Sequence, residues 1–372
     1  ADVRVLVMGG TQFNGLALVH ELVRAGHDVT VCNRGRTEAD LPPSVERLVA
    51  DRTDHERLRE VLGGSEWDCV HDVTAYHPED VEIMLELFGG NRIGHYVFAS
   101  STVTYATSDV LPITEDFPDD RGPDQNQYGL HKLLCEDRLF AAHADHGFPA
   151  TSVPFSMVVG PHNSLPDREL RMFARLRAGR PVLVPGDGET LLQVGHVDDQ
   201  ARALEQMMGR EITFGRRTNL TGHQAVTRAG YVETIADVVG VAPDVRFVPA
   251  QVMEDLWTGR RSLGMGQSAV RMDVRGGGGK ELDPARMLLA ERFRIASTLV
   301  QALAPNLHWW NRSVVFSIDR LRTDIGWEPQ HDLESMMDHT YEWFCRAGLD
   351  RADTYDWTAE DELLADLEGL DR

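Results

Sequence analysis

Residues 3–26 have the sequence VRVLVMGGTQFNGLALVHELVRAG, and this stretch decides the fold. Val3–Met8 is a continuous apolar run, which is typical of a buried strand. Leu16–Arg24 repeats apolar residues at helical spacing and stops at Gly26. The turn between them, Gly9–Gly15, meets the start of the helix, where backbone N–H groups can bind an anion. A strand, a glycine-rich turn and a helix in this order predict the phosphate loop of a dinucleotide site.

The loop departs from the usual spacing Gly-x-x-Gly-x-x-Gly, because Gln12 replaces the middle glycine. Taken alone, this motif could be a tight turn that binds no ligand. Its position between a strand and a helix favours a loop that binds a dinucleotide cofactor. The loop residues expected at the cofactor are Gly9, Thr11, Gln12, Phe13, Asn14 and Gly15.

Strand and helix patterns continue to alternate over the first 160 residues, which predicts an α/β fold with a doubly wound parallel sheet. Expected strands are Val3–Met8, Asp28–Cys32, Arg47–Val49, Asp68–Val73, Tyr96–Ala99 and Ala150–Phe155; expected helices include Leu16–Arg24, 54–62, Glu79–Leu87, Gln127–His146, Leu170–Ala178 and Val197–Met208. We expect residues 1–165 and about 190–225 to form the dinucleotide-binding domain. Residues 166–189 and 226–372 then form a smaller C-terminal α/β substrate domain, with an insertion at 258–303.

The end of the second strand bears on the choice of cofactor. An acidic residue there would bind the ribose 2′-hydroxyl of NAD, but the chain has Asn33, which can still hydrogen-bond a hydroxyl. Arg34 or Arg36 could instead pair with the 2′-phosphate of NADP, or both could be solvated loop residues. NAD is the expected cofactor, and NADP remains the alternative.

Tyr128 and Lys132 form a rare pair. The chain has only two lysines and 7 tyrosines, so chance would give Tyr-x-x-x-Lys about 0.04 times in this sequence. Residues i and i+4 share a helix face, and an ammonium beside a phenol lowers the pKa of the phenol. The pair therefore predicts a general base for an alcohol proton.

Composition limits the partners and the compartment. The net charge of −22 argues against nucleic acid or an anionic membrane as the main partner. The four cysteines are far apart in sequence and form no metal or redox pair, and no apolar run approaches a membrane span. The N-terminus enters a strand pattern without a signal-peptide core, so we expect a cytoplasmic protein without a metal.

With these motifs in place, the chain resembles the extended short-chain dehydrogenase/reductase family, also called the NAD-dependent epimerase/dehydratase family. The GGTxFxG loop is most similar to a branch that includes chloroplast stem-loop-binding-like proteins. The motifs that carry the resemblance are Gly9–Gly15, Ala50–Arg52, Val97–Tyr105, Tyr128–Lys132, Val158–Pro161, His196–Asp199, Ser317–Asp319 and Leu321–Pro329.

The resemblance implies roles for individual residues. Ser101, with Ser100 as its neighbouring alternative, would hold the reacting oxygen; Tyr128 would be the general acid/base; Lys132 would bind the nicotinamide ribose and tune Tyr128. Asp51 and Arg52 match the pair that contacts adenine, and Thr74 and Ala75 match further cofactor contacts. Two helices, Glu79–Leu87 and Gln127–His146, match a dimer interface, so a homodimer is expected.

Departures from the family concern the substrate. Leu192 stands where nucleotide-sugar epimerases place an arginine for the substrate pyrophosphate, and Met157 stands where they often have an asparagine. Thr102 and Val103 follow Ser101, so the Asp-Glu pair of the 4,6-dehydratases is missing. Arg168, Arg171 or Arg312 could restore the missing charge from elsewhere. Tyr76, His77, Thr102, Met157 and Arg312 are the residues expected to contact the substrate. His308, Trp309 and Trp310 could also line the pocket, or they could be core residues.

Three functions remain open. The first is an NAD(P)-dependent epimerase or dehydratase that transiently oxidises a secondary alcohol on a sugar, nucleoside or related polyol, not an ordinary nucleoside-diphosphate sugar. The second is a net NADP-dependent reductase of a ketone or aldehyde. The third is a non-enzymatic RNA-binding or scaffold protein, which the acidic charge disfavours.

Overall fold

The computed structural model describes residues 3–163, 168–258, 260–261, 311–351, 355 and 357–370. The insertion expected at 258–303 lies outside the described residues except for residues 258, 260 and 261, and so do His308, Trp309 and Trp310.

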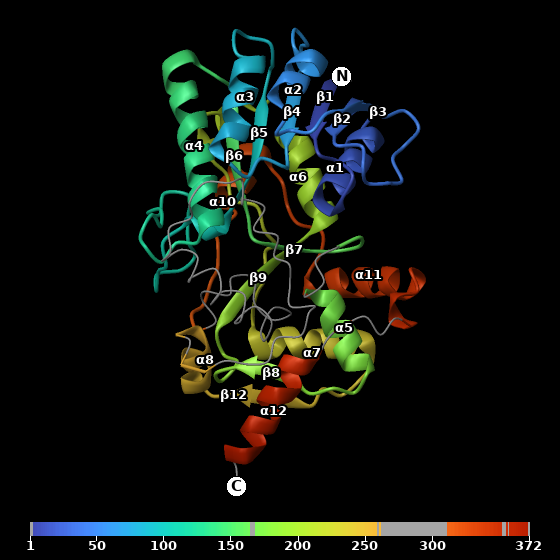
Figure 1. Ribbon diagram of the computed structural model, residues 1–372, viewed down its shortest axis with the longest axis vertical. Helices are drawn as coiled ribbons and strands as arrows, with labels where there is room; N and C mark the ends of the chain where they lie inside the picture. The colour runs from blue at the N-terminus through green and yellow to red at the C-terminus, as the bar shows by residue number, and fades with distance from the viewer. Residues whose placement is uncertain are drawn as a thin grey trace.

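Seven parallel strands form a large sheet in the upper lobe of the molecule (Figure 1). They are β1 (Arg4–Met8), β2 (Asp28–Asn33), β3 (Glu46–Val49), β4 (Cys69–Asp72), β5 (Tyr96–Ser101), β6 (Ala150–Phe155) and β10 (Arg216–Arg217). The spatial order is β10-β6-β5-β4-β1-β2-β3. The order runs outward from β1 in both directions, which confirms the predicted doubly wound sheet.

Helices cover both faces of this sheet. One face carries α1 (Phe13–Arg24), α6 (Val197–Met207) and α10 (Asp319–Ile325), and the other carries α2 (His55–Leu62), α3 (Pro78–Phe88) and α4 (Gln127–His146). Along β1, Val5 and Val7 pack on the α1 side, and Leu6 and Met8 pack on the opposite side. This alternation follows from the two-residue period of a strand, so one short apolar run supplies both cores.

The lower lobe is a smaller α/β unit with mixed sheets. Its strands are β7 (Met157–Val159), β8 (Val182–Pro185), β9 (Leu191–His196), β11 (Ala225–Thr227) and β12 (Val245–Val248). Its helices are α5 (Glu169–Arg177), α7 (Arg228–Val239), α8 (Ala250–Trp257), α11 (Leu333–Arg346) and α12 (Thr358–Leu370). The strand β9 pairs parallel with β7 and antiparallel with β11, while β8 pairs parallel with β12. Side chains of α5, α7 and α11 share one core with β7, β8 and β9.

Short 3-10 helices complete the fold as η1 (Thr102–Thr104), η2 (Glu211–Thr213) and η4 (Leu349–Arg351). The sequence patterns did not identify β7, β8, β9, β10, β11, β12, α7, α8, α10 or α11. Helix α1 begins three residues earlier than expected, so the last residues of the predicted turn, Phe13–Gly15, belong to the first turn of the helix. All four cysteines are free thiols. Among the described residues, no helix is long and apolar enough to span a membrane.

Candidate active site

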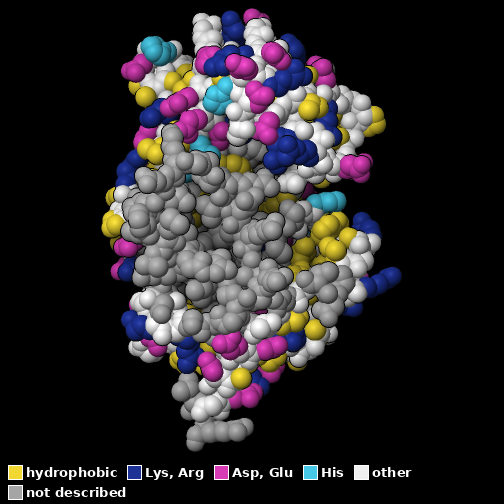
Figure 2. All heavy atoms as spheres, viewed as in Figure 1, with side chains coloured by type: hydrophobic (Ala, Val, Ile, Leu, Met, Phe, Trp, Pro, Cys, Tyr) yellow, Lys and Arg dark blue, Asp and Glu magenta, His cyan; other side chains and the backbone are white. Residues whose placement is uncertain are grey.

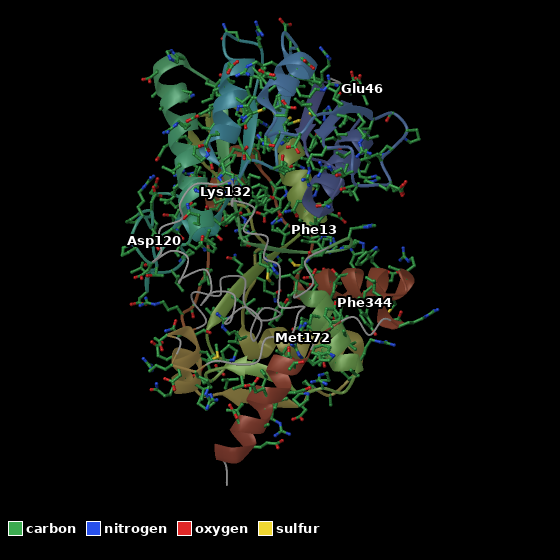
Figure 3. The ribbon with its side chains drawn as sticks, viewed as in Figure 1. Phe13, Glu46, Asp120, Lys132, Met172 and Phe344 are labelled. Atoms are coloured by element: carbon green, nitrogen blue, oxygen red, sulfur yellow. The ribbon has the colours of Figure 1, made fainter. Side chains whose placement is uncertain are left out.

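The glycine turn joins β1 to α1 at the edge of the upper lobe that faces the lower lobe, where Phe13 is labelled in Figure 3. Gly9 has a φ of 113°, and a Cβ atom there would lie 2.8 Å from Thr74 Cγ2. A Cβ atom on Gly15 would lie 2.7 Å from the backbone nitrogen of Gly10. Side chains are therefore excluded at both ends of the loop, which leaves a backbone cradle of the kind that a pyrophosphate needs.

Two side chains of the cradle also fit a ligand. Gln12 is exposed and occupies the N-cap of α1 without a side-chain capping bond. Asn14 Oδ1 is buried and lacks a hydrogen-bond partner among the described residues. Buried polar atoms are normally satisfied, so this oxygen is a candidate acceptor for a cofactor hydroxyl.

At the end of β2, the structure limits what Asn33 can do. Its Oδ1 accepts hydrogen bonds from Gly35 N (2.9 Å) and from Arg47 Nε and Nη2 (3.1 and 2.9 Å). The oxygen that was expected to meet a ribose hydroxyl is therefore already engaged by the protein. Arg47 was missed from the sequence because it lies on β3 and meets Asn33 only through sheet pairing.

Arg34 and Arg36 are exposed beside the carboxylate of Asp51. The pKa of Asp51 is lowered first by the hydrogen bond from Thr53 N, against a smaller opposing effect of burial, and further by the two guanidinium charges. Arg34, Arg36 and Asp51 thus lie close together, at the place where we expected the adenosine end of a cofactor.

Arg52 belongs to a buried polar network, which the sequence did not indicate. Its Nη1 and Nη2 donate to Asp72 Oδ1 and Oδ2 at 2.7 and 3.0 Å, and they also reach Thr74 Oγ1 (2.8 Å) and Asp80 O (2.9 Å). Asp72 additionally accepts from the Tyr96 hydroxyl at 2.6 Å. The side chain of Arg52, expected at adenine, instead braces the β4–α3 turn, which leaves its backbone for a cofactor.

Lys132 lies at the centre of the candidate site, inside the upper lobe above the junction with the lower lobe (Figure 3). Its ammonium donates to Ala75 O and Ala99 O, both at 2.7 Å. Its Nζ also lies 4.8 Å from the ring centroid of Tyr76 and 5.6 Å from that of Tyr128. The lysine thus ties the ends of β4 and β5 to α4, which brings the predicted residues Ala75, Tyr76, Tyr128 and Lys132 together.

The side chain of Ser101, the residue predicted to hold the reacting oxygen, lies beside Tyr128 and lowers the pKa of its phenol. The neighbouring Ser100 hydroxyl is buried without a partner among the described residues. Of the two serines, Ser101 is thus the one that acts on the Tyr128 phenol.

The predicted lowering of the Tyr128 pKa by Lys132 is wrong for this structure. Burial raises the pKa of Tyr128, and the Ser101 hydrogen bond and the positive charge of Arg168 offset only part of that rise. Burial likewise lowers the pKa of Lys132. Shared helix spacing predicted the contact correctly, but desolvation is the largest effect on the pKa of each group.

Of the remaining residues expected at the substrate, His77 and Thr102 lie in the upper lobe near the ends of its strands, whereas Met157 and Arg312 lie elsewhere. His77 caps α3, its ring lies 4.5 Å from that of His131, and Thr102 is buried directly after Ser101. Met157 packs in the core of the lower lobe, and Arg312 pairs with Asp109 at the surface with N and O 3.3 Å apart. Within the described part of the chain, the hydrogen bonds, ion pairs and ring contacts of these two side chains do not involve Tyr128.

Of the three arginines considered as substitutes for a pyrophosphate-binding residue, only Arg168 acts on Tyr128 electrostatically. Arg171 is buried against Glu360 (3.2 Å) and the ring of Trp357. Leu192, at the position of the missing arginine, is fully buried in the lower core.

Comparison with known proteins gives a consistent result. Residues 5–220 match the model of the NAD dependent epimerase/dehydratase family. The chain is 32% identical over 253 residues to the chloroplast stem-loop binding protein of 41 kDa b of Arabidopsis thaliana, which covers 64% of each protein. It thus spans just under two thirds of that relative's length.

A second relative is 2'-dehydrokanamycin reductase of Streptomyces kanamyceticus, 27% identical over 252 residues that cover 67% of this chain and 70% of the relative. Among solved structures, an epimerase of Methanothermobacter thermautotrophicus superposes with a TM-score of 0.69 at 20% identity and covers 94% of both chains. At this identity the superposition supports the fold alone.

Proposed function

This chain belongs to the NAD-dependent epimerase/dehydratase family, and we propose that it is an enzyme that transiently oxidises a secondary alcohol and thereby epimerises or dehydrates its substrate. The observation that carries the proposal is that Ser101 and the buried ammonium of Lys132 both lie beside Tyr128, with the Lys132 nitrogen 5.6 Å from the centre of the Tyr128 ring. A serine hydroxyl, a phenol and a cation at one strand edge are the groups needed to move an alcohol proton.

The family binds NAD, and the cradle of this chain fits a dinucleotide. We propose that the backbone of Gly9–Gly15 holds the pyrophosphate, that Asp51 and the Arg52 backbone meet the adenosine, and that Thr74 and Ala75 line the nicotinamide side. When bound, the nicotinamide supplies the acceptor and donor for hydride.

The residues of the chain then control the proton. Tyr128 takes the hydroxyl proton of the substrate as the carbon is oxidised, while Ser101 donates a hydrogen bond to the resulting carbonyl oxygen. Lys132 holds the ends of β4 and β5 in place and supplies positive charge near the phenolate. The keto group either is reduced on its other face, or it acidifies the C–H bond of the neighbouring carbon. In the second case that proton and the hydroxyl group of the next carbon leave together as water, and the hydride taken from the alcohol carbon is returned to the unsaturated ketone.

The substrate that we propose is a sugar, nucleoside or related polyol without a diphosphate. Leu192 lies in the lower core and cannot offer the bidentate cation that a pyrophosphate prefers. Isothermal titration with UDP-glucose and with free sugars or amino sugars tests this class. Tight binding of UDP-glucose alone would contradict it.

The central test is Tyr128→Phe, with Tyr341→Phe as a matched control. Both substitutions delete one phenolic oxygen, and that of Tyr341, on α11, accepts a hydrogen bond from Arg177 of α5 at 2.7 Å. We expect Tyr128→Phe to reduce turnover by about 10²–10⁴-fold and the control to leave it unchanged. More than about a tenth of wild-type turnover in Tyr128→Phe would contradict the acid/base role.

A net NADP-dependent reductase of a ketone or aldehyde is the second candidate. It is favoured by the exposed Arg34 and Arg36 beside Asp51, and by the absence of an acidic residue at the end of β2. An epimerase consumes no reduced cofactor over a full turnover, so stoichiometric loss of NADPH would select the reductase.

The similarity to the chloroplast stem-loop binding protein makes RNA binding a third candidate function for this chain. The GGTxFxG loop supports placing the chain in the same branch of the family. Acidic and basic side chains are intermingled over the visible face of the upper lobe, without a broad basic surface (Figure 2). We propose a small-molecule substrate in the cytoplasm; binding of stem-loop RNA that persists at physiological salt would contradict this.

We also propose a homodimer through α3 and α4. These helices lie side by side, and Arg138 and Glu82 join them with N and O 2.8 Å apart. Light scattering on the full chain would reveal a monomer if the proposal is wrong.

A further inference from the structure

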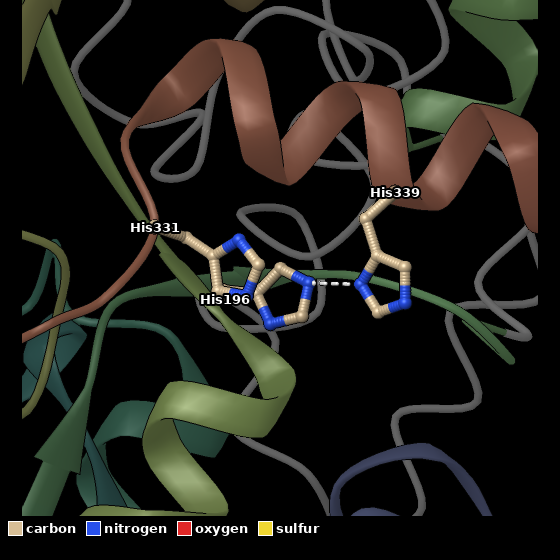
Figure 4. Close-up of side chains that lie close together, drawn as sticks. All are labelled: His196, His331 and His339. Atoms are coloured by element: carbon tan, nitrogen blue, oxygen red, sulfur yellow. Dashed lines mark hydrogen bonds between the residues drawn. The ribbon is translucent and has the colours of Figure 1, made fainter.

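Three histidines meet where β9, α6 and α11 come together (Figure 4), and none of them belongs to the proposed redox site. His196 ends β9 and caps α6, His331 lies in the loop before α11, and His339 lies on α11. Each residue has one ring nitrogen that lies within 4.8 Å of a ring nitrogen of each of the other two. Residues 143 positions apart in sequence therefore form one compact imidazole cluster.

The distances between these rings suit a shared cation. His196 Nε2 and His339 Nδ1 are 2.9 Å apart and form a hydrogen bond. Two nitrogens on a tetrahedral Zn²⁺ at 2.0–2.1 Å lie about 3.3 Å apart, so a small outward movement lets an ion replace the shared proton. His196 and His331 are stacked with centroids 3.9 Å apart, so the His331 ring must turn to point its nitrogen at the same ion. His331 and His339 are partly exposed, which gives both side chains room to turn.

Neighbouring groups supply the outer contacts of such a site. The hydrogen bond between His331 Nδ1 and Ser335 Oγ (3.1 Å), with the imidazole as donor, leaves Nε2 of His331 free as a ligand atom. His196 Nδ1 now accepts from Asp198 N at 3.0 Å, and ligation through Nε2 would place the ring proton on Nδ1 instead. The carboxylate of Asp198 lies 4.0 Å from that atom and can accept the proton's hydrogen bond.

We propose that His196, His331 and His339 bind one divalent transition-metal ion of the type that prefers imidazole, with Zn²⁺ as the reference ion. Asp198 and Ser335 orient the ligands, and a water molecule completes the coordination. The ion joins the N-terminus of α6 to α11 and so fastens the upper lobe to the lower lobe. The ligand set shares no residue with Ser101, Tyr128 and Lys132, so metal binding and turnover can be measured separately.

The test is a titration of the full chain with Zn²⁺ against a chromophoric chelator, with Co²⁺ as a spectroscopic probe of the same site. We expect one ion per chain and a tetrahedral Co²⁺ spectrum without thiolate charge transfer. His339→Ala should weaken binding by about 100-fold or more, and Asp198→Asn by about 10–100-fold. His146→Ala, which removes an exposed histidine from the end of α4, is the control and should change nothing.

Three results would overturn the proposal: no ion bound by the wild type, unchanged affinity in His339→Ala, or loss of binding in His131→Ala, which disrupts the His77–His131 pair instead. If His339→Ala fails to fold, Asp198→Asn remains informative because its side chain is 56% exposed. Zn²⁺ should raise the melting temperature of the wild type more than that of Asp198→Asn, and an equal rise would also contradict the site.

Discussion

Replacing Asp72 by asparagine tests how the cofactor edge of the upper lobe is held in place. The carboxylate is fully buried and accepts four hydrogen bonds: two from Arg52, one from the Tyr96 hydroxyl and one from Thr74 N. The Arg52 charge holds the pKa of Asp72 below its usual range, against a larger opposing effect of burial. Asparagine keeps the shape but turns one acceptor into a donor that faces other donors.

The expected loss of stability follows from burial. Removing one partner of a buried ion pair leaves the other charge without compensation and costs about 3–5 kcal/mol. In this protein Asp80 Oδ1, 3.4 Å from Arg52 Nε, is the remaining carboxylate, which places the expected loss near the lower end of that range. The chain offers a matched control in Arg59 and Glu86, a bidentate pair of similar length (2.6 and 3.0 Å) on the exposed surface. Glu86→Gln should therefore cost far less than Asp72→Asn.

Urea unfolding of both variants, followed by circular dichroism, measures the difference. The Asp72→Asn variant should also bind NAD more weakly, because Arg52 and Asp72 hold Thr74, and the next residue, Ala75, accepts the hydrogen bond of Lys132. Equal unfolding midpoints for the two variants, with an unchanged slope in urea, would refute the assignment of Arg52 and Asp72 as the brace.

Other sites give further expectations. Ser101→Ala removes the hydroxyl that lowers the pKa of Tyr128. Oxidation of the substrate should slow by about 100-fold, and the pH profile of the rate should move to higher pH. An unshifted pH profile would contradict the pairing of Ser101 with Tyr128. Burial lowers the pKa of His71 to about 3. Below pH 6.5 His71 is therefore protonated in the unfolded chain but still neutral in the native state, so the free energy of unfolding falls by about 1.4 kcal/mol per pH unit. Because both ring nitrogens of His71 lack partners among the described residues, His71→Leu should reduce this acid slope by one proton, as unfolding free energies from pH 7 to 4 would reveal. Arg34→Gln should weaken NADP binding at least tenfold and leave NAD binding nearly unchanged if Arg34 meets the 2′-phosphate; equal effects on both cofactors would exclude that contact.

The upper lobe could be predicted because its signals are local. The run around Val5–Met8 alternates between two cores, and the glycines directly after it admit no side chain. The α/β character of the lower lobe and its helix α5 could also be predicted, but its strands could not, because β7, β8, β11 and β12 have only three or four residues each. Such short runs carry too little periodicity to separate a strand from a loop, and their pairing depends on segments far away in the chain.

The candidate site divides in the same way. The spacing of Tyr128 and Lys132 predicted that both side chains lie on one face of α4, and Lys132 lies within cation–π distance of the Tyr128 ring. The pKa of Tyr128 depends on burial by other elements, which helical spacing does not encode. The family resemblance placed Arg52 at the cofactor, and its pairing with Asp72, 20 residues away on β4, could not be predicted from the sequence. The histidine cluster was also invisible, since β9 and α11 meet only in the folded chain.

The two departures that bear on the substrate, Met157 and Leu192, lie in one core. Met157 pairs in register with Val194 across β7 and β9, and Leu192 pairs with Val226 across β9 and β11. Met157, Leu192 and Val194 pack together with α5, α7 and α11, so apolar side chains at both positions stabilise the lower lobe. A charged arginine at position 192 would have to be buried in that core without a partner of opposite charge, at a large cost in free energy. The residue at position 192 thus packs the lower lobe and offers no cation to a pyrophosphate, which is why we propose a substrate without a diphosphate at Tyr128.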